Sequence, residues 1–356
     1  MNLKKYFSET MVKWFQKNKR DLPFRRTKNP YHIWISEIMA QQTQIDTLIP
    51  YSERFILKFP DIATLAEASE EEVLKSWEGL GYYSRAKNLH KAAKKIMTDY
   101  NGCFPTDFDD ILALPGIGPY TGGAIGSIAL GLHVPAVDGN VLRVITRFNN
   151  WNDDIAQNST KRKVTEWVTD TIPETPGDFN ESLMELGALI CTPKSPSCLI
   201  CPVREHCAAF AAGTVDQLPV KTKKQKQKKM NMEVGLLYNK DGIYICKRPE
   251  TGLLSGLWGF PICEAEKEKG KAVTALLEKN TGTSLSGTCI GKSRHIFSHI
   301  IWEMSLYAFK LNSSTIKEEK ITYGDTDDFF FSSWEDLNEK YTLPTAFSKL
   351  LPYIEH

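Results

Sequence analysis

The sequence has no apolar run long enough to span a membrane, and it carries almost no net charge. A transmembrane helix needs about 20 consecutive apolar residues, and the apolar runs here are all shorter. The 44 Lys and Arg residues balance 43 Asp and Glu residues, which leaves a formal net charge of +1. Any attraction to nucleic acid must therefore come from local patches. Residues 1–20 also lack the apolar core of a signal peptide, so we expect a cytoplasmic protein.

Cysteine is scarce outside one short segment of the chain. Cys103, Cys246, Cys263 and Cys289 are isolated in sequence and are interpreted as ordinary thiols. The other four cysteines follow the spacing C-x6-C-x2-C-x5-C, and they are Cys191, Cys198, Cys201 and Cys207. Because nothing in the sequence indicates an oxidising compartment, this cluster predicts a metal centre in place of two disulfides.

The cysteine segment contains prolines at positions 193, 196 and 202, which keep a helix from carrying the ligands apart. Thiolates select zinc or an iron–sulfur cluster over harder ions. The spacing alone leaves both open.

The chain changes character after this segment. Residues 1–212 show apolar periodicity typical of helices, and residues 34–49 predict one amphipathic helix with Glu37, Gln41 and Gln44 on a common stripe. The stretch VKTKKQKQKK (220–229) is basic and lacks core residues, so we interpret 213–230 as a linker. It serves either as a solubilising tether or as a DNA contact.

Residues 231–356 predict a separate α+β domain. NMEVGLLYN and GIYICKR have β-rich composition and are joined by Lys-Asp-Gly, which favours a hairpin. A helix is expected at 267–280, followed by further strands through IFSHIIWEMSLYAFKL.

The segment LPGIGPY (114–120) is the second strong motif. Gly116 and Gly118 permit a close backbone approach in a tight turn. A helix that begins behind such a turn presents backbone amides to a phosphate oxygen. This is the helix–hairpin–helix pattern, although a Gly-x-Gly turn alone is more often a plain interhelical connection.

A third motif, VPAVDGNV (134–141), places Asp138 at the start of a predicted helix. Aspartate is a favoured N-cap residue. Taken alone, the motif favours a structural cap, with Asn140 as a turn residue.

The order SEIMAQQTQ, GLGYYSRA, LPGIGPYT, VDGNV and then the cysteine loop closely resembles adenine DNA glycosylases of the MutY type. The resemblance covers essentially the whole chain. It implies a multidomain protein: an all-α helix–hairpin–helix glycosylase with a 4Fe–4S cluster on the cysteine loop, plus a C-terminal α+β Nudix-like domain. The implied boundaries are a six-helix barrel at 29–133, a cluster domain of 1–28 with 134–212, the linker at 213–230 and the Nudix-like domain at 231–356.

The resemblance also implies a monofunctional base-excision repair enzyme that removes adenine opposite 8-oxoguanine or guanine. Glu37 would be the general acid, with a pKa raised towards neutrality, and Asp138 would stabilise the oxocarbenium ion or act as a transient nucleophile. Tyr120 and Asn140 would orient the intermediate and the attacking water. Endonuclease III-type relatives carry a lysine at the position of Tyr120, and a phenol cannot form their Schiff base.

The resemblance further implies a monomer that binds double-stranded DNA containing the mispair. The remaining implied sites contact this DNA. The adenine pocket would include Arg25, Glu181, Phe24 and Ala40. DNA contacts would come from Gln42, Thr43, Leu80, Tyr82, Gly116 and Gly118, with Arg20, Arg85 and Arg143 as phosphate contacts. The 8-oxoguanine side would be read by Phe297, Ser298 and His299, for which an ordinary alternating strand is the competing interpretation.

Two departures from the family pattern lie near the implied adenine pocket. The family commonly has Trp where this chain has Phe24 and Leu where this chain has Ala40. The smaller side chains of this chain are expected to loosen the stacking of the base. An endonuclease III-type lyase and a non-catalytic iron–sulfur DNA-binding protein remain the alternatives. Tyr120 opposes the first, and the retention of both carboxyls opposes the second. The chain lacks the glutamate cluster of catalytic Nudix enzymes, so its last domain is expected to recognise and not to hydrolyse.

Overall fold

The computed structural model describes residues 3–222, 227–310, 321–323 and 326–354. The chain divides into two compact units, residues 1–68 with 84–223 and residues 69–83 with 224–356. The segment 69–83, which the sequence analysis assigned to the 29–133 barrel, thus makes its contacts with the C-terminal unit. No helix in the described part of the chain has the length and hydropathy of a membrane span.

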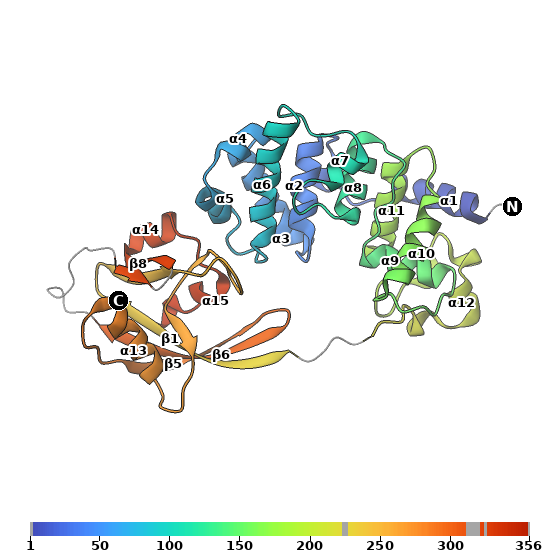
Figure 1. Cartoon of the computed structure of the whole chain (residues 1–356). Helices are drawn as coiled ribbons and strands as arrows, with labels where there is room; N and C mark the ends of the chain where they lie inside the picture. The colour runs from blue at the N-terminus through green and yellow to red at the C-terminus, as the bar shows by residue number, and fades with distance from the viewer. Residues whose placement is uncertain (1–2, 223–226, 311–320, 324–325, 355–356) are drawn as a thin grey trace. The chain divides into compact units, whose positions relative to one another are not determined.

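The first unit is helical (Figure 1). Its elements are α1 (Leu3–Asn18), η1 (Pro23–Arg25), α2 (Pro30–Ala40), α3 (Ile45–Lys58), α4 (Ile62–Glu67), α6 (Ser84–Asp99), α7 (Phe108–Leu112), α8 (Pro119–Leu130), α9 (Gly139–Phe148), α10 (Asn158–Thr169), α11 (Pro176–Leu189), η2 (Cys198–Ile200), η3 (Arg204–His206), α12 (Ala208–Ala212) and η4 (Val215–Gln217).

The N-terminal helix α1 packs against helices from much later in the sequence. Phe7 and Met11 of α1 are completely buried in a core formed with α9, α10 and α11. Three of the clustered cysteines border the same core, and they are Cys191, Cys201 and Cys207. The beginning of the chain therefore shares a core with the cysteine loop.

The predicted helix over residues 34–49 is interrupted, and this part of the sequence prediction is wrong. Helix α2 ends at Ala40 and α3 begins at Ile45, because Gln42 adopts a left-handed φ of 60°. Arg85 satisfies the end of α2 by donating from Nη1 to the carbonyls of Ile38, Met39 and Gln41 at 2.8, 3.1 and 2.7 Å. Gln41 and Gln44 consequently do not share a helical stripe with Glu37.

The Gly-rich motif forms the predicted turn between α7 and α8. Gly116 has a φ of 79°, and a Cβ there would lie 2.7 Å from Cβ of Asn88. Gly118 caps α8 with an extended backbone, and a Cβ there would meet nothing within 4 Å. Gly116 is therefore required by the fold, whereas Gly118 leaves open space in front of the helix.

The second unit is a mixed sheet with helices on both faces. It contains α5 (Glu70–Ser76), β1 (Lys228–Tyr238), β2 (Gly242–Lys247), β3 (Trp258–Gly259), β4 (Ile262–Glu264), α13 (Lys271–Thr281), β5 (Thr288–Ile296), β6 (Ile300–Lys310), β7 (Ile321–Tyr323), β8 (Thr326–Ser333), α14 (Trp334–Glu339), α15 (Thr345–Ser348) and η5 (Leu351–Tyr353). The main path of the sheet runs β5-β6-β1-β2-β8-β7, and β1 pairs with β6 in parallel.

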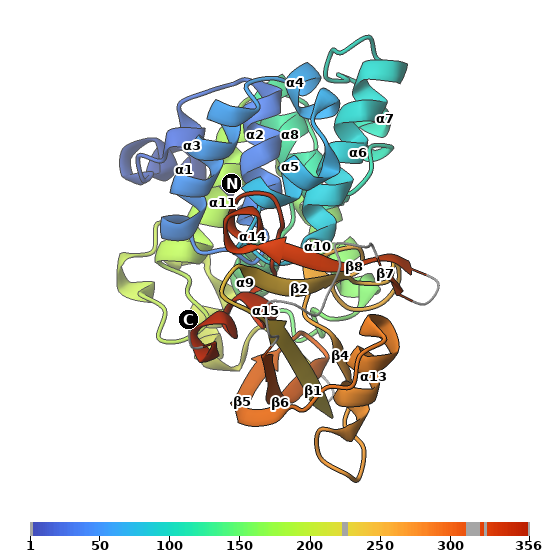
Figure 2. The same cartoon turned by 90° about the vertical axis from the view of Figure 1, so that its left-hand side faces the viewer.

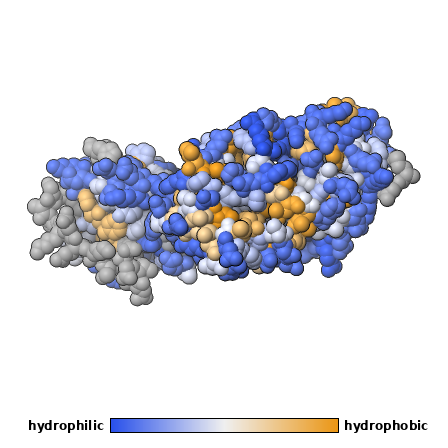
Figure 3. Space-filling view, turned by 90° about the horizontal axis from the view of Figure 1, so that it is seen from above, coloured by the Kyte–Doolittle hydropathy of each residue, from blue (hydrophilic) through white to orange (hydrophobic). Residues whose placement is uncertain are grey.

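Successive residues of β1 point to opposite faces of this sheet. Leu236 belongs to the buried cluster that contains Phe347 of α15, while Leu237 belongs to the cluster that contains Val273 and Leu277 of α13. Figure 2 shows α15 and α13 on opposite sides of β1. The β1–β2 hairpin and a helix near 267–280 are confirmed, and Asn239 Oδ1 accepts hydrogen bonds from the amides of Asp241 and Gly242. The surface in Figure 3 is mainly hydrophilic, with hydrophobic residues in small separate patches.

Candidate functional site

The helical unit contains a cavity of about 290 Å³ between η1, α2, α8, α11 and the start of α9. It gathers residues that lie far apart in sequence. The predicted residues that line it are Arg20, Phe24, Arg25, Glu37, Ala40, Thr43, Tyr120, Asp138, Asn140 and Glu181. The tertiary structure therefore brings the proposed catalytic residues and the proposed adenine pocket into one cavity.

Glu37 is the only acidic residue of α2, a helix whose other faces are packed in the core. Asn29 caps the helix through a hydrogen bond from the amide of Tyr31, and Pro30 occupies its first position. The carboxyl of Glu37 accepts a 2.8 Å hydrogen bond from the Tyr120 hydroxyl. Burial raises the pKa of Glu37 to about 7, so about half of the population holds a proton at neutral pH.

Asp138 caps a helix and also presents its carboxyl to the cavity. Its Oδ1 caps α9 by accepting from the Val141 amide at 2.8 Å, while Oδ2 accepts from Asn140 Nδ2 at 2.7 Å. Burial raises the pKa of this carboxyl, and the hydrogen bonds from Val141 and Asn140 oppose that rise. The structural cap expected from the sequence is present, and the same carboxyl also lines the cavity.

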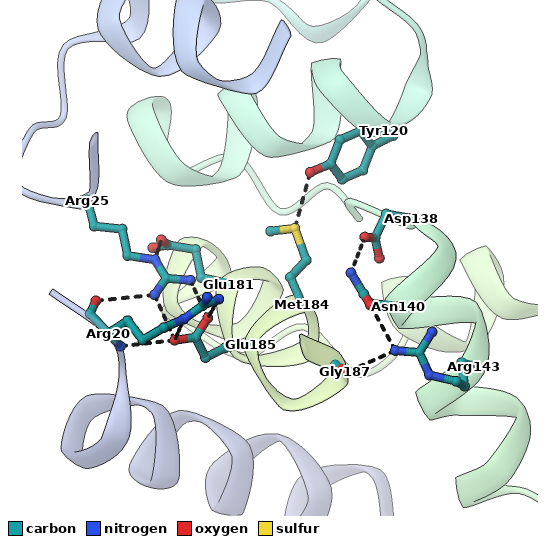
Figure 4. Close-up of polar contacts among 10 residues, drawn as sticks. All are labelled: Arg20, Arg25, Tyr120, Asp138, Asn140, Arg143, Glu181, Met184, Glu185 and Gly187. Atoms are coloured by element: carbon teal, nitrogen blue, oxygen red, sulfur yellow. Dashed lines mark hydrogen bonds and ion pairs between the residues drawn. The ribbon is translucent and has the colours of Figure 1, made fainter. Parts of the chain in front are cut away.

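Asn140 is held by Arg143 (Figure 4). Arg143 Nη2 donates to Asn140 Oδ1 and to the carbonyl of Gly187, both at 2.8 Å, and Nε donates to the carbonyl of Cys191 at 2.7 Å. A Cβ at Gly187 would lie 2.5 Å from Cβ of Asn140. Arg143 is only 7% exposed, so its predicted phosphate contact is corrected to an internal role.

A buried charge network forms another wall of the cavity. Arg25 donates from Nε to Glu181 at 3.0 Å and also pairs with Glu185. Arg20 pairs with Glu185 at 2.6 Å and its side chain is 35% exposed, so its phosphate contact stays a prediction. Arg85 donates to the carbonyls at the end of α2, and its phosphate contact also stays a prediction.

Eight cavity residues were missed by the sequence analysis, and three of them carry a polar or sulfur atom, namely Ser36, Met184 and Glu185. Met184 Sδ lies 3.3 Å from the Tyr120 hydroxyl oxygen. The spacing Glu181, Met184, Glu185, Ala188 places one face of α11 along the cavity, and this i, i+3, i+4, i+7 pattern could have identified Met184 and Glu185.

Phe24 and Ala40 line the cavity at the positions where the family commonly has larger side chains. Gln42 is exposed and lies in the strained turn between α2 and α3. Positive φ values in non-glycine residues cost free energy and cluster at functional sites.

The second unit joins two predicted residues that are 216 positions apart. The Tyr82 hydroxyl and Ser298 Oγ lie 3.2 Å apart. Tyr82 is 47% exposed and has a φ of 47°, in the segment that follows Leu80. Phe297, Ser298 and His299 form the turn between β5 and β6, where Phe297 packs edge-on against Trp302 with centroids 4.8 Å apart. The competing interpretation of a regular strand is therefore wrong.

The four clustered cysteines line a single cavity and carry no disulfide. Its other walls include Ile190, Phe210 and Val215, and Arg147 Nη1 lies 3.4 Å from Cys191 Sγ. In the described residues, no three Cys, His, Asp or Glu side chains converge closely enough for a single metal ion. Four thiols around one cavity are the donor set of an iron–sulfur cluster. Burial raises the pKa of the Cys201 thiol to about 12, so a bound positive centre is needed to favour its thiolate.

Comparisons with known families agree with this organisation. Residues 35–170 match the HhH-GPD superfamily base excision DNA repair protein, and residues 191–207 match the iron-sulfur binding domain of endonuclease III. Residues 233–353 match a NUDIX domain. A solved structure of a thermostable thymine-DNA glycosylase is similar over 59% of this chain and 97% of its own, with a TM-score of 0.54 and 28% identity. The fold and the site define a helix–hairpin–helix DNA glycosylase with an iron–sulfur cluster and a Nudix-like domain.

The individual proteins that resemble this chain narrow the family further. The adenine DNA glycosylase of Buchnera aphidicola (subspecies Acyrthosiphon pisum) is 35% identical over 86% of this chain and 87% of its own length. The adenine DNA glycosylase of Homo sapiens is 32% identical over 87% of this chain and 68% of its own. The chain belongs to the adenine DNA glycosylase family, the MutY type, and is a hydrolase of N-glycosidic bonds in DNA.

Proposed function

We propose that this enzyme releases adenine mispaired with 8-oxoguanine or guanine, by acid-assisted hydrolysis of the N-glycosidic bond. The observation that carries the proposal is one cavity containing a carboxyl with a pKa of about 7 and a second carboxyl held by hydrogen bonds. Two carboxyls in different environments can divide the tasks of acid and charge stabiliser.

Adenine is a poor leaving group until it is protonated. Glu37 supplies this proton in the proposed mechanism, because its neutral form is well populated near pH 7. The hydrogen bond from Tyr120 orients the Glu37 carboxyl. As the bond breaks, positive charge develops on the sugar and favours the ionised form of Asp138, which stabilises it or bonds to it transiently. Asn140 holds Asp138 Oδ2 and orients the intermediate and the attacking water.

The target base must leave the helical stack before it can enter the cavity. Phe24 and Ala40 would then contact its faces, and the pair Arg25–Glu181 would meet its polar edge. Gln42, Thr43 and Leu80 would fill or probe the gap left in the duplex. The open space at Gly118, at the N-terminus of α8, would receive a phosphate.

The base opposite adenine would be recognised by the second unit. Tyr82 and Ser298 already lie within hydrogen-bonding distance of each other, and Phe297 and His299 flank Ser298 in the β5–β6 turn. The sequence lacks the glutamate cluster that binds magnesium in catalytic Nudix enzymes. We therefore assign this unit to recognition of 8-oxoguanine.

Cys191, Cys198, Cys201 and Cys207 would hold the 4Fe–4S cluster, which stabilises the loop they belong to. We expect the enzyme to act as a monomer. Tyr120 in place of a lysine leaves no amine at this position for β-lyase chemistry, so we expect a monofunctional enzyme.

The proposal is tested with a duplex carrying one adenine opposite 8-oxoguanine, guanine or thymine. Release of adenine opposite 8-oxoguanine and guanine, with strand breakage only after alkali, is the expected result. Glu37→Gln should bind the duplex and lose excision by about 10²–10⁴-fold, the usual contribution of a general acid. Strand breakage without alkali would contradict the monofunctional assignment, and equal release opposite thymine would contradict the mispair specificity.

A further inference from the structure

Glu185 is the most heavily hydrogen-bonded side chain around the cavity, although it was not identified from sequence. Its side chain is 1% exposed. Its Oε1 accepts from the backbone amide and Nε of Arg20, both at 2.9 Å, and from Arg25 Nη1 at 3.0 Å. Its Oε2 accepts from Arg20 Nη2 at 2.6 Å and from Arg25 Nη2 at 2.9 Å.

These contacts hold both ends of one short segment of chain. Arg25 Nη1 also donates to the carbonyl of Arg20 at 3.3 Å, which closes the segment on itself. Between the two arginines lie Leu22 and Phe24, and both line the cavity. The segment has just one short element of regular structure, η1, so its position depends on the Glu185 carboxylate more than on backbone ladders.

Glu185 also balances two positive charges near the proposed acid. The two guanidiniums lower the pKa of Glu185 to about 2, so the carboxylate is ionised throughout the working range. Arg25 lowers the pKa of Glu37, in opposition to burial, Glu181 and Asp138, which raise it. The charged and titratable groups that act on the pKa of Glu37 are Arg25 beside η1, Tyr120 on α8, Asp138 before α9 and Glu181 on α11. Arg20 and Glu185 line the same cavity.

We propose that Glu185 is a positioning residue that fixes the Arg20–Arg25 segment as a wall of the base pocket and offsets the positive charge that the two arginines bring to the cavity of Glu37. The geometry of five hydrogen bonds from two arginines onto one buried carboxylate is the basis of this assignment. The inference rests on the proposed role of Glu37 as the acid.

Charge and geometry can be separated by a set of variants. Glu185→Gln removes the charge and keeps the shape, whereas Glu185→Asp keeps the charge and shortens the reach. Arg20→Gln removes one cation and leaves no buried charge unpaired, so it remains informative if Glu185→Gln does not fold. The double variant Glu185→Gln/Arg20→Gln restores the net charge of the wild-type pocket. Glu166→Gln, on the exposed face of α10 with a side chain 69% exposed, is the matched control for loss of one carboxylate.

The readout is the single-turnover rate of adenine release opposite 8-oxoguanine between pH 5.5 and 9, together with a melting curve of each variant. Since the protonated acid is the active form, the wild-type rate falls as the pH rises through about 7. This falling part of the pH–rate profile is its alkaline limb. We expect Glu185→Gln to move this alkaline limb down by on the order of 0.5–1 pH unit, which is less than the roughly 1–3 units produced by a charge in direct contact, because Arg25 lies between the two carboxyls in the charge network. Arg20→Gln should move it up, and the double variant should return it towards the wild-type position.

Glu185→Asp should lower the rate without moving the limb, and Glu166→Gln should change neither. The proposal is overturned if the limb stays in place in both Glu185→Gln and Arg20→Gln, because a merely structural residue would lower rates without shifting the profile. It is also overturned if the double variant moves the limb further from wild type. Failure of the proposed function is visible separately, because the wild-type enzyme would then release no adenine or show no limb near pH 7.

Discussion

Replacing Glu37 with glutamine should stabilise the protein at alkaline pH while abolishing its activity. The carboxyl has a pKa of about 7 in the folded protein against an ordinary value of 4.5. The folded state therefore binds this proton more tightly than the unfolded state does. The stability that the proton confers is fully present below pH 4.5 and is lost as the pH rises to 7.

The size of the effect follows from the difference between the two pKa values. A gap of about 2.5 units, at 1.36 kcal/mol per unit, destabilises the folded wild type by about 3 kcal/mol above pH 7, and by about 1 kcal/mol at pH 5. Glutamine has similar shape, carries no charge and still offers an oxygen to the Tyr120 hydroxyl. The stability advantage of Glu37→Gln should thus grow from about 1 kcal/mol at pH 5 to about 3 kcal/mol at pH 8.

The assay is denaturant unfolding of the wild type and Glu37→Gln at pH 5 and pH 8, followed by circular dichroism. Comparing the difference between the two proteins at each pH cancels the titration of every other group. Glu166→Gln, whose carboxylate is exposed, should show the same small difference at both pH values. A Glu37→Gln advantage that does not change with pH, or a loss of stability at pH 8, would refute the assignment of a raised pKa to this carboxyl.

Other variants test the remaining parts of the structure. Gly116→Ala should lower the free energy of unfolding by about 1–3 kcal/mol, because of its φ of 79° and the close Asn88 side chain, while Gly118→Ala should keep the melting temperature and weaken DNA binding in a titration. Asp138→Asn should retain DNA affinity in a gel-shift assay and lose excision, and a variant that still excises would remove Asp138 from the mechanism. Cys201→Ser should lose the visible absorption of the cluster and lower the melting temperature, whereas Cys103→Ser, at an exposed cysteine, should do neither.

The sequence predicted the fold class and the kinds of chemistry correctly because these depend on local patterns. The spacing of four cysteines, the Gly-x-Gly turn and the change to β-rich composition after residue 230 are each readable within a short window. The interruption at Gln42 was not readable in this way. The apolar period continues across it, and the helix ends because Arg85, from another helix, satisfies the carbonyls there.

The contacts of three arginines were also not predictable from the sequence. From sequence, Arg20, Arg85 and Arg143 were equivalent basic residues near motifs that bind DNA. In the structure each of them binds acceptors of the protein itself: Arg20 binds Glu185, Arg85 binds the end of α2, and Arg143 binds Asn140 and Gly187. A guanidinium binds whichever acceptor the fold brings near, and sequence position does not reveal that acceptor.

The sequence by itself determined which groups are available: a carboxyl on an apolar helix, a second carboxyl at a helix start, four thiols and a phenol where relatives have an amine. Only the tertiary structure decided what those groups do. It placed Glu37, Asp138 and Tyr120 around one cavity, buried Glu37 enough to raise its pKa to about 7, and set Glu185 between two arginines. Burial and charge proximity depend on distances between residues far apart in the chain, and those distances are set by packing.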